Sequence, residues 1–140
     1  MATDEQRTAV RGQRKLSQLE LMNFYTDFKD FRKYMYRGID KMPRWIKDSE
    51  GQECIHAIKQ SLRYLSVVAR TYDKPTKVRN IDLFLTEWDV VADSISFFAE
   101  VKGIDSHQRQ VMCDLKYRVE EQVSALRTWL MNNAEPLITQ

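Results

Sequence analysis

The sequence predicts an all-α fold, an antiparallel up-down-up-down four-helix bundle in a single domain. Its apolar residues recur in alternating steps of three and four, which is the spacing of one buried face on a helix. Only four glycines and three prolines interrupt the 140 residues, and 43% of the residues are hydrophobic. This composition argues against disorder and against a turn-rich β-sandwich, and the length suits one core.

The first helix is predicted from an apolar, largely aromatic stripe that should end near Gly38. The stripe consists of Leu21, Phe24, Phe28, Phe31, Met35 and Ile39. Ahead of it, residues 1–15 hold too few large apolar side chains to offset the entropy of ordering. Their basic residues are Arg7, Arg11, Arg14 and Lys15. We therefore predict a basic, flexible N-terminal arm over residues 1–15, a bundle over residues 16–133 and a C-terminal tail over residues 134–140.

The second helix is expected after Pro43, with a start at Asp48 or Ser49. Its apolar stripe consists of Ile55, Ile58, Leu62, Leu65, Ala69 and Tyr72. The segment Asp73-Lys74-Pro75 should separate it from the third helix, because proline is tolerated in the first helical turn and not in the interior. The third stripe consists of Val78, Ile81, Leu85, Trp88, Ala92, Ile95 and Ala99.

The turn before the fourth helix contains residues that stop and start helices. Gly103 is predicted to take the left-handed conformation that closes the third helix, with Ile104 making the accompanying apolar contact. Asp105 or Ser106 should cap the fourth helix, and Asp105 has the capping-box spacing to Gln108. The fourth stripe consists of Val111, Leu115, Val119, Val123, Leu126 and Leu130. Because the connections are short, consecutive helices should be antiparallel.

The two cysteines, Cys54 and Cys113, are predicted to be reduced thiols in the core. They lie far apart among helix-forming residues, which fits neither a disulfide framework nor a zinc pattern. No stretch reaches the roughly 18 consecutive apolar residues of a membrane span, and the polar, charged N-terminus is unlike a signal peptide. A soluble, cytoplasmic protein is expected.

A metal site is one catalytic alternative, because four-helix bundles often house di-iron centres. Glu53 and His56 form one Glu-x-x-His motif, which places two ligands on one helical face. Such a site needs a second motif and two more glutamates, and His107, the only other histidine, starts a helix without them. No metal and no cofactor are therefore expected.

Other catalytic chemistry also lacks its residues. The chain has no glycine-rich nucleophile elbow, no Cys/His pair at a suggestive spacing and no glycine loop that would cradle a phosphate. We expect neither a catalytic site nor a small-molecule substrate.

The charged residues are divided unevenly along the chain. Residues 1–80 hold 17 Lys and Arg against 10 Asp and Glu, and residues 81–140 hold 5 against 10. On the first helix and the following turn, basic residues repeat at helical spacing, and such like charges repel unless a partner neutralises them. A phosphate backbone is the obvious partner. The candidate nucleic-acid-binding residues are Arg32, Lys33, Arg37, Lys41, Arg44 and Lys47.

Two alternatives to nucleic-acid binding are open. The basic residues also fit an ordinary solvated surface, partly balanced by Asp27, Asp30 and Asp40. They could instead meet an acidic stripe on the third helix of another subunit, in head-to-tail contacts that close into a ring. This stripe consists of Asp82, Asp89, Asp93 and Glu100.

Two tryptophans are candidates for a protein interface. Trp45 and Trp129 each lie near a helix end and close to an arginine, where a half-exposed ring can serve a partner surface. The candidate protein-interface residues are Trp45, Asp82, Asp89, Asp93 and Trp129.

The order of these features resembles a known family. The first helix ends before Met42-Pro43-Arg44, the second closes on Ala69-Arg70, and the last ends in Leu126-Arg127-Thr128-Trp129-Leu130. This order is similar to that of a four-helix bundle family. The family contains the accessory variability determinant (Avd) proteins of diversity-generating retroelements and the proteins encoded in ribosomal RNA intervening sequences. The similarity spans residues 17–131.

The resemblance implies a homopentameric ring with positive surfaces that engage a reverse transcriptase and its template RNA during mutagenic copying. Pro43 and Arg44 stand where the family has proline and then a basic residue, and Trp129 stands where it has tryptophan. The third helix departs from the family pattern over residues 88–93, which leaves RNA contact to the first helix and its turn.

We therefore expect a non-enzymatic accessory protein of a diversity-generating retroelement. Three rival functions stay open: a self-assembling scaffold that binds only protein, a ferritin-like metal enzyme, and a ribosomal RNA intervening-sequence protein of unknown role.

Overall fold

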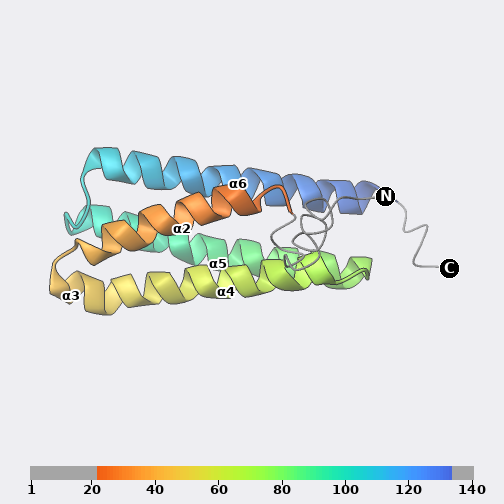
Figure 1. The fold of residues 1–140 in the computed structure, drawn as a ribbon, viewed down its shortest axis with the longest axis horizontal. Coiled ribbons are helices and arrows are strands. Elements are labelled where there is room, and N and C mark those ends of the chain that lie inside the picture. Colours follow the sequence, from red (N-terminus) through yellow and green to blue (C-terminus); the bar gives the residue numbers. More distant parts are fainter. Residues whose placement is uncertain (1–21, 134–140) are drawn as a thin grey trace, which may run out of the picture.

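The computed structural model describes residues 22–133, which form four long helices packed against one another (Figure 1). These are α2 (Tyr25–Asp40), α4 (Gln52–Arg70), α5 (Lys74–Glu100) and α6 (Ser106–Asn132), with the short helix α3 (Arg44–Ile46) and the π-helical turn η2 (Lys47–Gly51) ahead of α4. The chain reverses direction between consecutive long helices, so the predicted all-α, antiparallel bundle is confirmed. This described part contains no strand.

Some predicted segments lie outside the described residues. These are the basic arm over residues 1–15, the first residues of the bundle (16–21) and the tail over residues 134–140. Within residues 22–133, no helix combines the length and the apolar character that crossing a bilayer requires.

The cores of α2 and α5 meet around one tryptophan. The indole of Trp88 lies 5.6 Å from the ring of Phe28, 5.0 Å from that of Phe31 and 4.8 Å from that of Phe84, measured between ring centroids. Its Nε1 donates a hydrogen bond of 3.2 Å to the carbonyl oxygen of Lys116 on α6. Trp88 therefore joins α2, α5 and α6 into one core.

The predicted apolar stripes hold for α2 and shift on α5. All the described members of the α2 stripe are buried. On α5, Phe84, Val91 and Phe98 are buried, whereas the predicted Leu85 and Ala92 are only partly buried. The buried face of α5, which packs against both α4 and α6, is therefore displaced by one residue from the predicted stripe at these positions.

The end of α4 differs from the prediction. Tyr72 was expected in the core stripe, but it is 88% exposed, because α4 ends at Arg70 and the backbone of Thr71 is already extended. The predicted separator follows directly. Asp73 caps α5 by accepting a hydrogen bond of 3.0 Å from the backbone N–H of Thr76, and Pro75 lies in the first turn.

The helical path into α4 begins earlier than Asp48 or Ser49. Pro43 is the N-cap residue of α3, and helical backbone then continues from Arg44 through η2 into α4. This earlier start turns Ile46 into the core. Gly51 is buried where the path passes α2, and a Cβ there would lie 2.8 Å from Cγ2 of Ile39.

The turn between α5 and α6 has the predicted motif one residue earlier than expected. Lys102, not Gly103, has the positive φ of 60°. The N–H groups of Lys102 and Gly103 donate to the carbonyl oxygens of Ala99 and Phe98, which is the Schellman pattern. Gly103 packs closely against α3, because a Cβ there would lie 3.1 Å from Cδ1 of Ile46, which would have to shift slightly.

The predicted capping box at the start of α6 is confirmed. The N–H of Gln108 donates to the carboxylate of Asp105 at 2.7 Å, and the N–H of Asp105 donates to the side-chain oxygen of Gln108 at 2.8 Å. Two N–H groups that the helix leaves unpaired are thereby satisfied.

Candidate nucleic-acid interface

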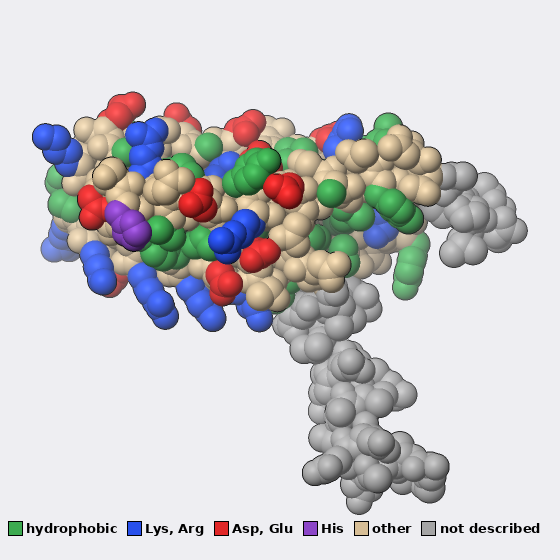
Figure 2. Space-filling view, turned by 90° about the horizontal axis from the view of Figure 1, so that it is seen from above, with side chains coloured by type: hydrophobic (Ala, Val, Ile, Leu, Met, Phe, Trp, Pro, Cys, Tyr) green, Lys and Arg blue, Asp and Glu red, His purple; other side chains and the backbone are tan. Residues whose placement is uncertain are grey.

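The packing of α2 places its basic residues on the outside of the bundle. Phe28, Phe31 and Met35 face the core, so Lys33 and Arg37 project into solvent. Lys29 is also exposed, and its ammonium lies 5.2 Å from the ring centroid of Tyr25. Figure 2 shows a row of Lys and Arg side chains along one edge of the bundle.

Four of the six candidate residues have no acidic partner within the part of the chain that the structure describes. Among the described residues, Arg32, Lys33, Arg37 and Lys41 take no part in an ion pair. Arg32 is half-buried beside Tyr36. Burial raises the pKa of the Tyr36 hydroxyl, and the nearby guanidinium of Arg32 lowers it by a smaller amount, so the pKa is raised overall. Within residues 22–133, no acidic side chain competes with an anionic partner for these four charges.

The other two candidate residues form ion pairs at the surface. The Arg44 Nε lies 3.2 Å from a carboxylate oxygen of Asp48, and the Lys47 Nζ lies 2.9 Å from one of Asp40. Exposed pairs of this kind contribute about 0–1 kcal/mol, so a phosphate can replace the carboxylate at small cost. Arg44 and Lys47 are therefore weaker candidates than the four on and just after α2.

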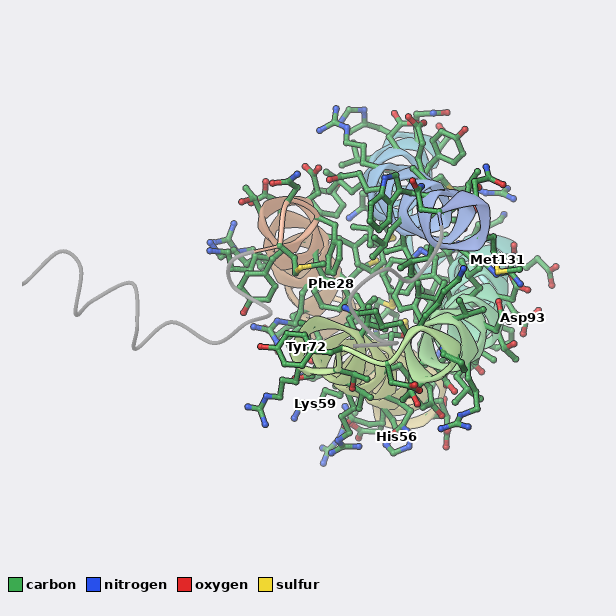
Figure 3. The ribbon with its side chains drawn as sticks, turned by 90° about the vertical axis from the view of Figure 1, so that its right-hand side faces the viewer. Phe28, His56, Lys59, Tyr72, Asp93 and Met131 are labelled. Carbon is green, nitrogen blue, oxygen red and sulfur yellow. The ribbon has the colours of Figure 1, made fainter. Side chains whose placement is uncertain are left out.

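The outer face of α4 carries basic residues that the sequence analysis missed. Lys59, Arg63 and Arg70 are exposed, because Cys54, Ile58 and Leu65 turn the opposite face of α4 into the core. Figure 3 shows Lys59 and His56 pointing outward from α4. These basic residues are four and seven positions apart, a helical spacing that could have indicated them. The basic residues of α2 stand closer together and gave the clearer pattern.

The two basic faces lie on neighbouring helices. α2 and α4 are joined by α3 and η2 and come together at that end of the bundle in Figure 1. We name the exposed basic residues of the two helices, with Lys41, the α2/α4 basic surface: Lys29, Lys33, Arg37, Lys41, Lys59, Arg63 and Arg70, together with the half-buried Arg32.

The acidic stripe lies on a different side of the bundle. Asp89, Asp93 and Glu100 are exposed on α5, and residues 81–100 contain five acidic residues and no basic one. In Figure 3, Asp93 and Lys59 point away from different sides of the molecule. Asp82 differs from these three residues because it pairs with a basic side chain. Its carboxylate accepts hydrogen bonds of 2.7 and 3.3 Å from Arg127, which raises the pKa of Arg127.

The structure does not bring the two candidate tryptophans together. Trp45 and Trp129 are each 59% exposed, as the sequence predicts for partner-facing rings. Trp45 belongs to α3 and Trp129 to the last turn of α6, at opposite ends of the bundle in Figure 1. Both rings can belong to one interface only if the α3 end of one copy meets the opposite end of another copy.

The prediction of two core thiols is half right. Cys54 is buried, and this burial raises its pKa to about 12, so the thiol is protonated at neutral pH. Cys113 is exposed, because its neighbour Met112 turns into the core in its place.

Glu53 and His56 are exposed, and the described residues hold no group of three or more His, Cys, Asp or Glu side chains placed for a metal ion.

No protein-family model matches this chain, and no curated protein matches it. In the structure Pro43 starts α3, Arg44 and Trp129 are exposed, and Ala69-Arg70 ends α4.

Proposed function

We propose that this protein is a non-enzymatic accessory protein that holds a reverse transcriptase and its template RNA in one complex, as the resemblance to Avd proteins implies. The observation that carries the proposal is the set of four positive charges on and just after α2 that have no acidic partner among residues 22–133. The four-helix architecture is consistent with the resemblance.

The proposed mechanism is positioning by phosphate contacts. Basic residues four positions apart on a helix are separated by about 6 Å along its axis, so the row from Lys29 to Lys41 extends about 18 Å. Like charges at this spacing destabilise a helix by a few tenths of a kcal/mol per pair, and bound phosphates relieve that repulsion. Contacts of this kind fix the register and orientation of a nucleic acid without reading its bases.

The binding test removes two charges from α2. The Lys33→Ala/Arg37→Ala variant should bind a structured RNA more weakly at every salt concentration. If each residue neutralises one phosphate, the slope of log affinity against log salt should fall in magnitude by about 1.4 to 1.8. Filter binding or fluorescence anisotropy from about 50 to 200 mM salt measures both quantities.

The matched control removes two exposed arginines from the other helices. Arg79→Ala/Arg109→Ala changes the net charge equally, and neither arginine belongs to the α2/α4 basic surface or to an ion pair among the described residues. It should retain the wild-type salt slope. Equal losses in the two double variants would remove the assignment to α2.

A self-assembling scaffold is the second candidate. It is favoured by the separation of the α2/α4 basic surface from the acidic residues of α5, since opposite charges on different sides suit head-to-tail contacts that close into a ring. The ring implied by the resemblance is a pentamer. A monomeric mass at tens of micromolar protein in low salt would exclude this candidate.

A further inference from the structure

Trp45 is a large aromatic residue left exposed at the end of the bundle where α2 and α4 come together. It belongs to α3 and is 59% exposed. Met42 and Ile46, which lie before and after it in the chain, are 5% and 1% exposed. The chain is therefore anchored in the core on both sides of Trp45, while the indole itself projects into solvent.

The backbone around Trp45 is held by hydrogen bonds within the same turn. The N–H groups of Ile46 and Lys47 both donate to the carbonyl oxygen of Pro43 at 3.0 Å. The hydroxyl of Ser49 donates to the carbonyl oxygen of Trp45 at 2.5 Å. An aromatic side chain on a fixed backbone loses little conformational freedom on binding, because only its two side-chain torsions have to be ordered.

The indole stands among basic side chains. Arg44, directly before it, has a side chain that is 93% exposed, and its acidic partner Asp48 is an exposed residue that a phosphate can replace at small cost. Lys41, four residues before Trp45, is exposed and belongs to the α2/α4 basic surface. Four residues span at most about 14 Å. A nucleic acid that lies along the row from Lys29 to Lys41 can therefore also contact the indole.

An exposed aromatic ring beside basic side chains is the combination with which proteins bind unpaired nucleotides. A base stacks on the ring while the basic side chains bind the phosphates on either side of it. In a duplex each base is already stacked between its neighbours, and extracting it costs free energy. The indole therefore favours an RNA with an unpaired base over a fully paired RNA that offers the same phosphates.

We propose that Trp45 stacks on an unpaired base of the RNA whose phosphates lie along α2. The ligand class is then an RNA with a single-stranded nucleotide beside the phosphates that Lys33, Arg37 and Lys41 contact. This inference rests on the proposed RNA binding, and it adds a contact with a base to a surface that otherwise contacts only the backbone.

Binding of two RNAs with the same number of phosphates tests the proposal. One is a blunt-ended duplex, and the other is a shorter duplex with a single-stranded extension. Trp45→Ala should weaken binding of the extended RNA about 5- to 150-fold, which is the usual effect of removing one base–aromatic stack. Binding of the blunt duplex and the salt slopes should stay unchanged, because the indole carries no charge. Trp45→Phe keeps an aromatic face and should retain most of the affinity.

Trp129→Ala is the matched control. Trp129 is also 59% exposed, but it belongs to the last turn of α6, at the opposite end of the bundle from α3 in Figure 1. Removing this ring changes the exposed apolar surface of the protein by a similar amount. Trp129→Ala should therefore bind both RNAs as the wild type does.

The outcomes separate this inference from the proposed function. If the wild type binds RNA and Lys33→Ala/Arg37→Ala weakens that binding, the proposed function stands whatever Trp45 does. Unchanged binding of the extended RNA by Trp45→Ala, or an equal loss for both RNAs, would then overturn the stacking contact alone. A smaller oligomer mass in Trp45→Ala with unchanged RNA affinity would overturn it as well and assign the ring to a protein interface. If the wild type binds neither RNA, both proposals fail.

Discussion

Lys116 is a buried lysine that lies beside the aromatic cluster at the centre of the bundle. Its ammonium lies 5.5 Å from the ring centroid of Trp88 and 3.0 Å from a carboxylate oxygen of Glu120. The residue is 8% exposed. Its long aliphatic stem packs in the core while the charged end reaches the carboxylate and the face of the indole, so the cost of burial is offset.

Two buried glycines should respond in opposite ways to an added methyl group. In Gly51→Ala, the new Cβ meets Ile39 Cγ2 at 2.8 Å and the backbone oxygen of Ile46 at 3.2 Å, so the packing of η2 must shift. We expect the free energy of unfolding to fall by about 1–3 kcal/mol. Urea unfolding followed by circular dichroism measures this change.

Gly38→Ala is the contrasting variant. Its Cβ would meet only the terminal methyl of Met112, at 2.9 Å, and that flexible side chain can move. Alanine also favours the interior of α2 by up to about 1 kcal/mol, so the free energy of unfolding should stay the same or rise. A larger loss in Gly38→Ala than in Gly51→Ala would contradict this account of the two close approaches.

At the residue scale, periodicity predicted the large aromatic core residues and failed at residues whose burial depends on helix rotation. Phe28 and Trp88 could be placed because bulky apolar residues at helical spacing have few other uses. Cys113 could not, since a rotation of α6 by one residue decides whether position 112 or 113 faces inward. Lys116 was missed because its type is seldom buried.

At the scale of elements, the starts of the two long helices α5 and α6 are fixed by the capping residue directly before each helix. Asp73 caps α5 and Asp105 caps α6, each through a carboxylate that accepts a backbone N–H. These starts were predictable because capping chemistry is local in sequence. The start at Arg44 was not, since helical backbone from α3 through η2 depends on Ile46 reaching the core.

Asp105→Ala should destabilise the protein by removing the capping box of α6. The N–H of Gln108 loses its acceptor, and we expect the free energy of unfolding to fall by about 1 kcal/mol. Ser106→Ala, at the next exposed position, is the control and should change it by no more than about 0.5 kcal/mol. Thermal or urea unfolding of the three proteins distinguishes them, and equal stability of Asp105→Ala and wild type would refute the role of the box.

At the scale of the whole molecule, the uneven division of charge along the chain places basic and acidic residues on different sides of the bundle. The exposed basic residues of α2 and α4 lie on one part of the surface and the acidic residues of α5 on another. The sequence predicted the division but not the full basic surface. Lys59 and Arg63 were missed because the basic residues of α4 are more widely spaced than those of α2, and periodicity does not determine how the two helices are placed.

Native affinity purification from the host, with and without nuclease, tests the central claim most directly. We predict that the tagged protein recovers a reverse transcriptase together with one structured RNA, and that nuclease removes the RNA. Recovery of the protein alone, as a closed ring without RNA or polymerase, would contradict the accessory function and favour the self-assembling scaffold.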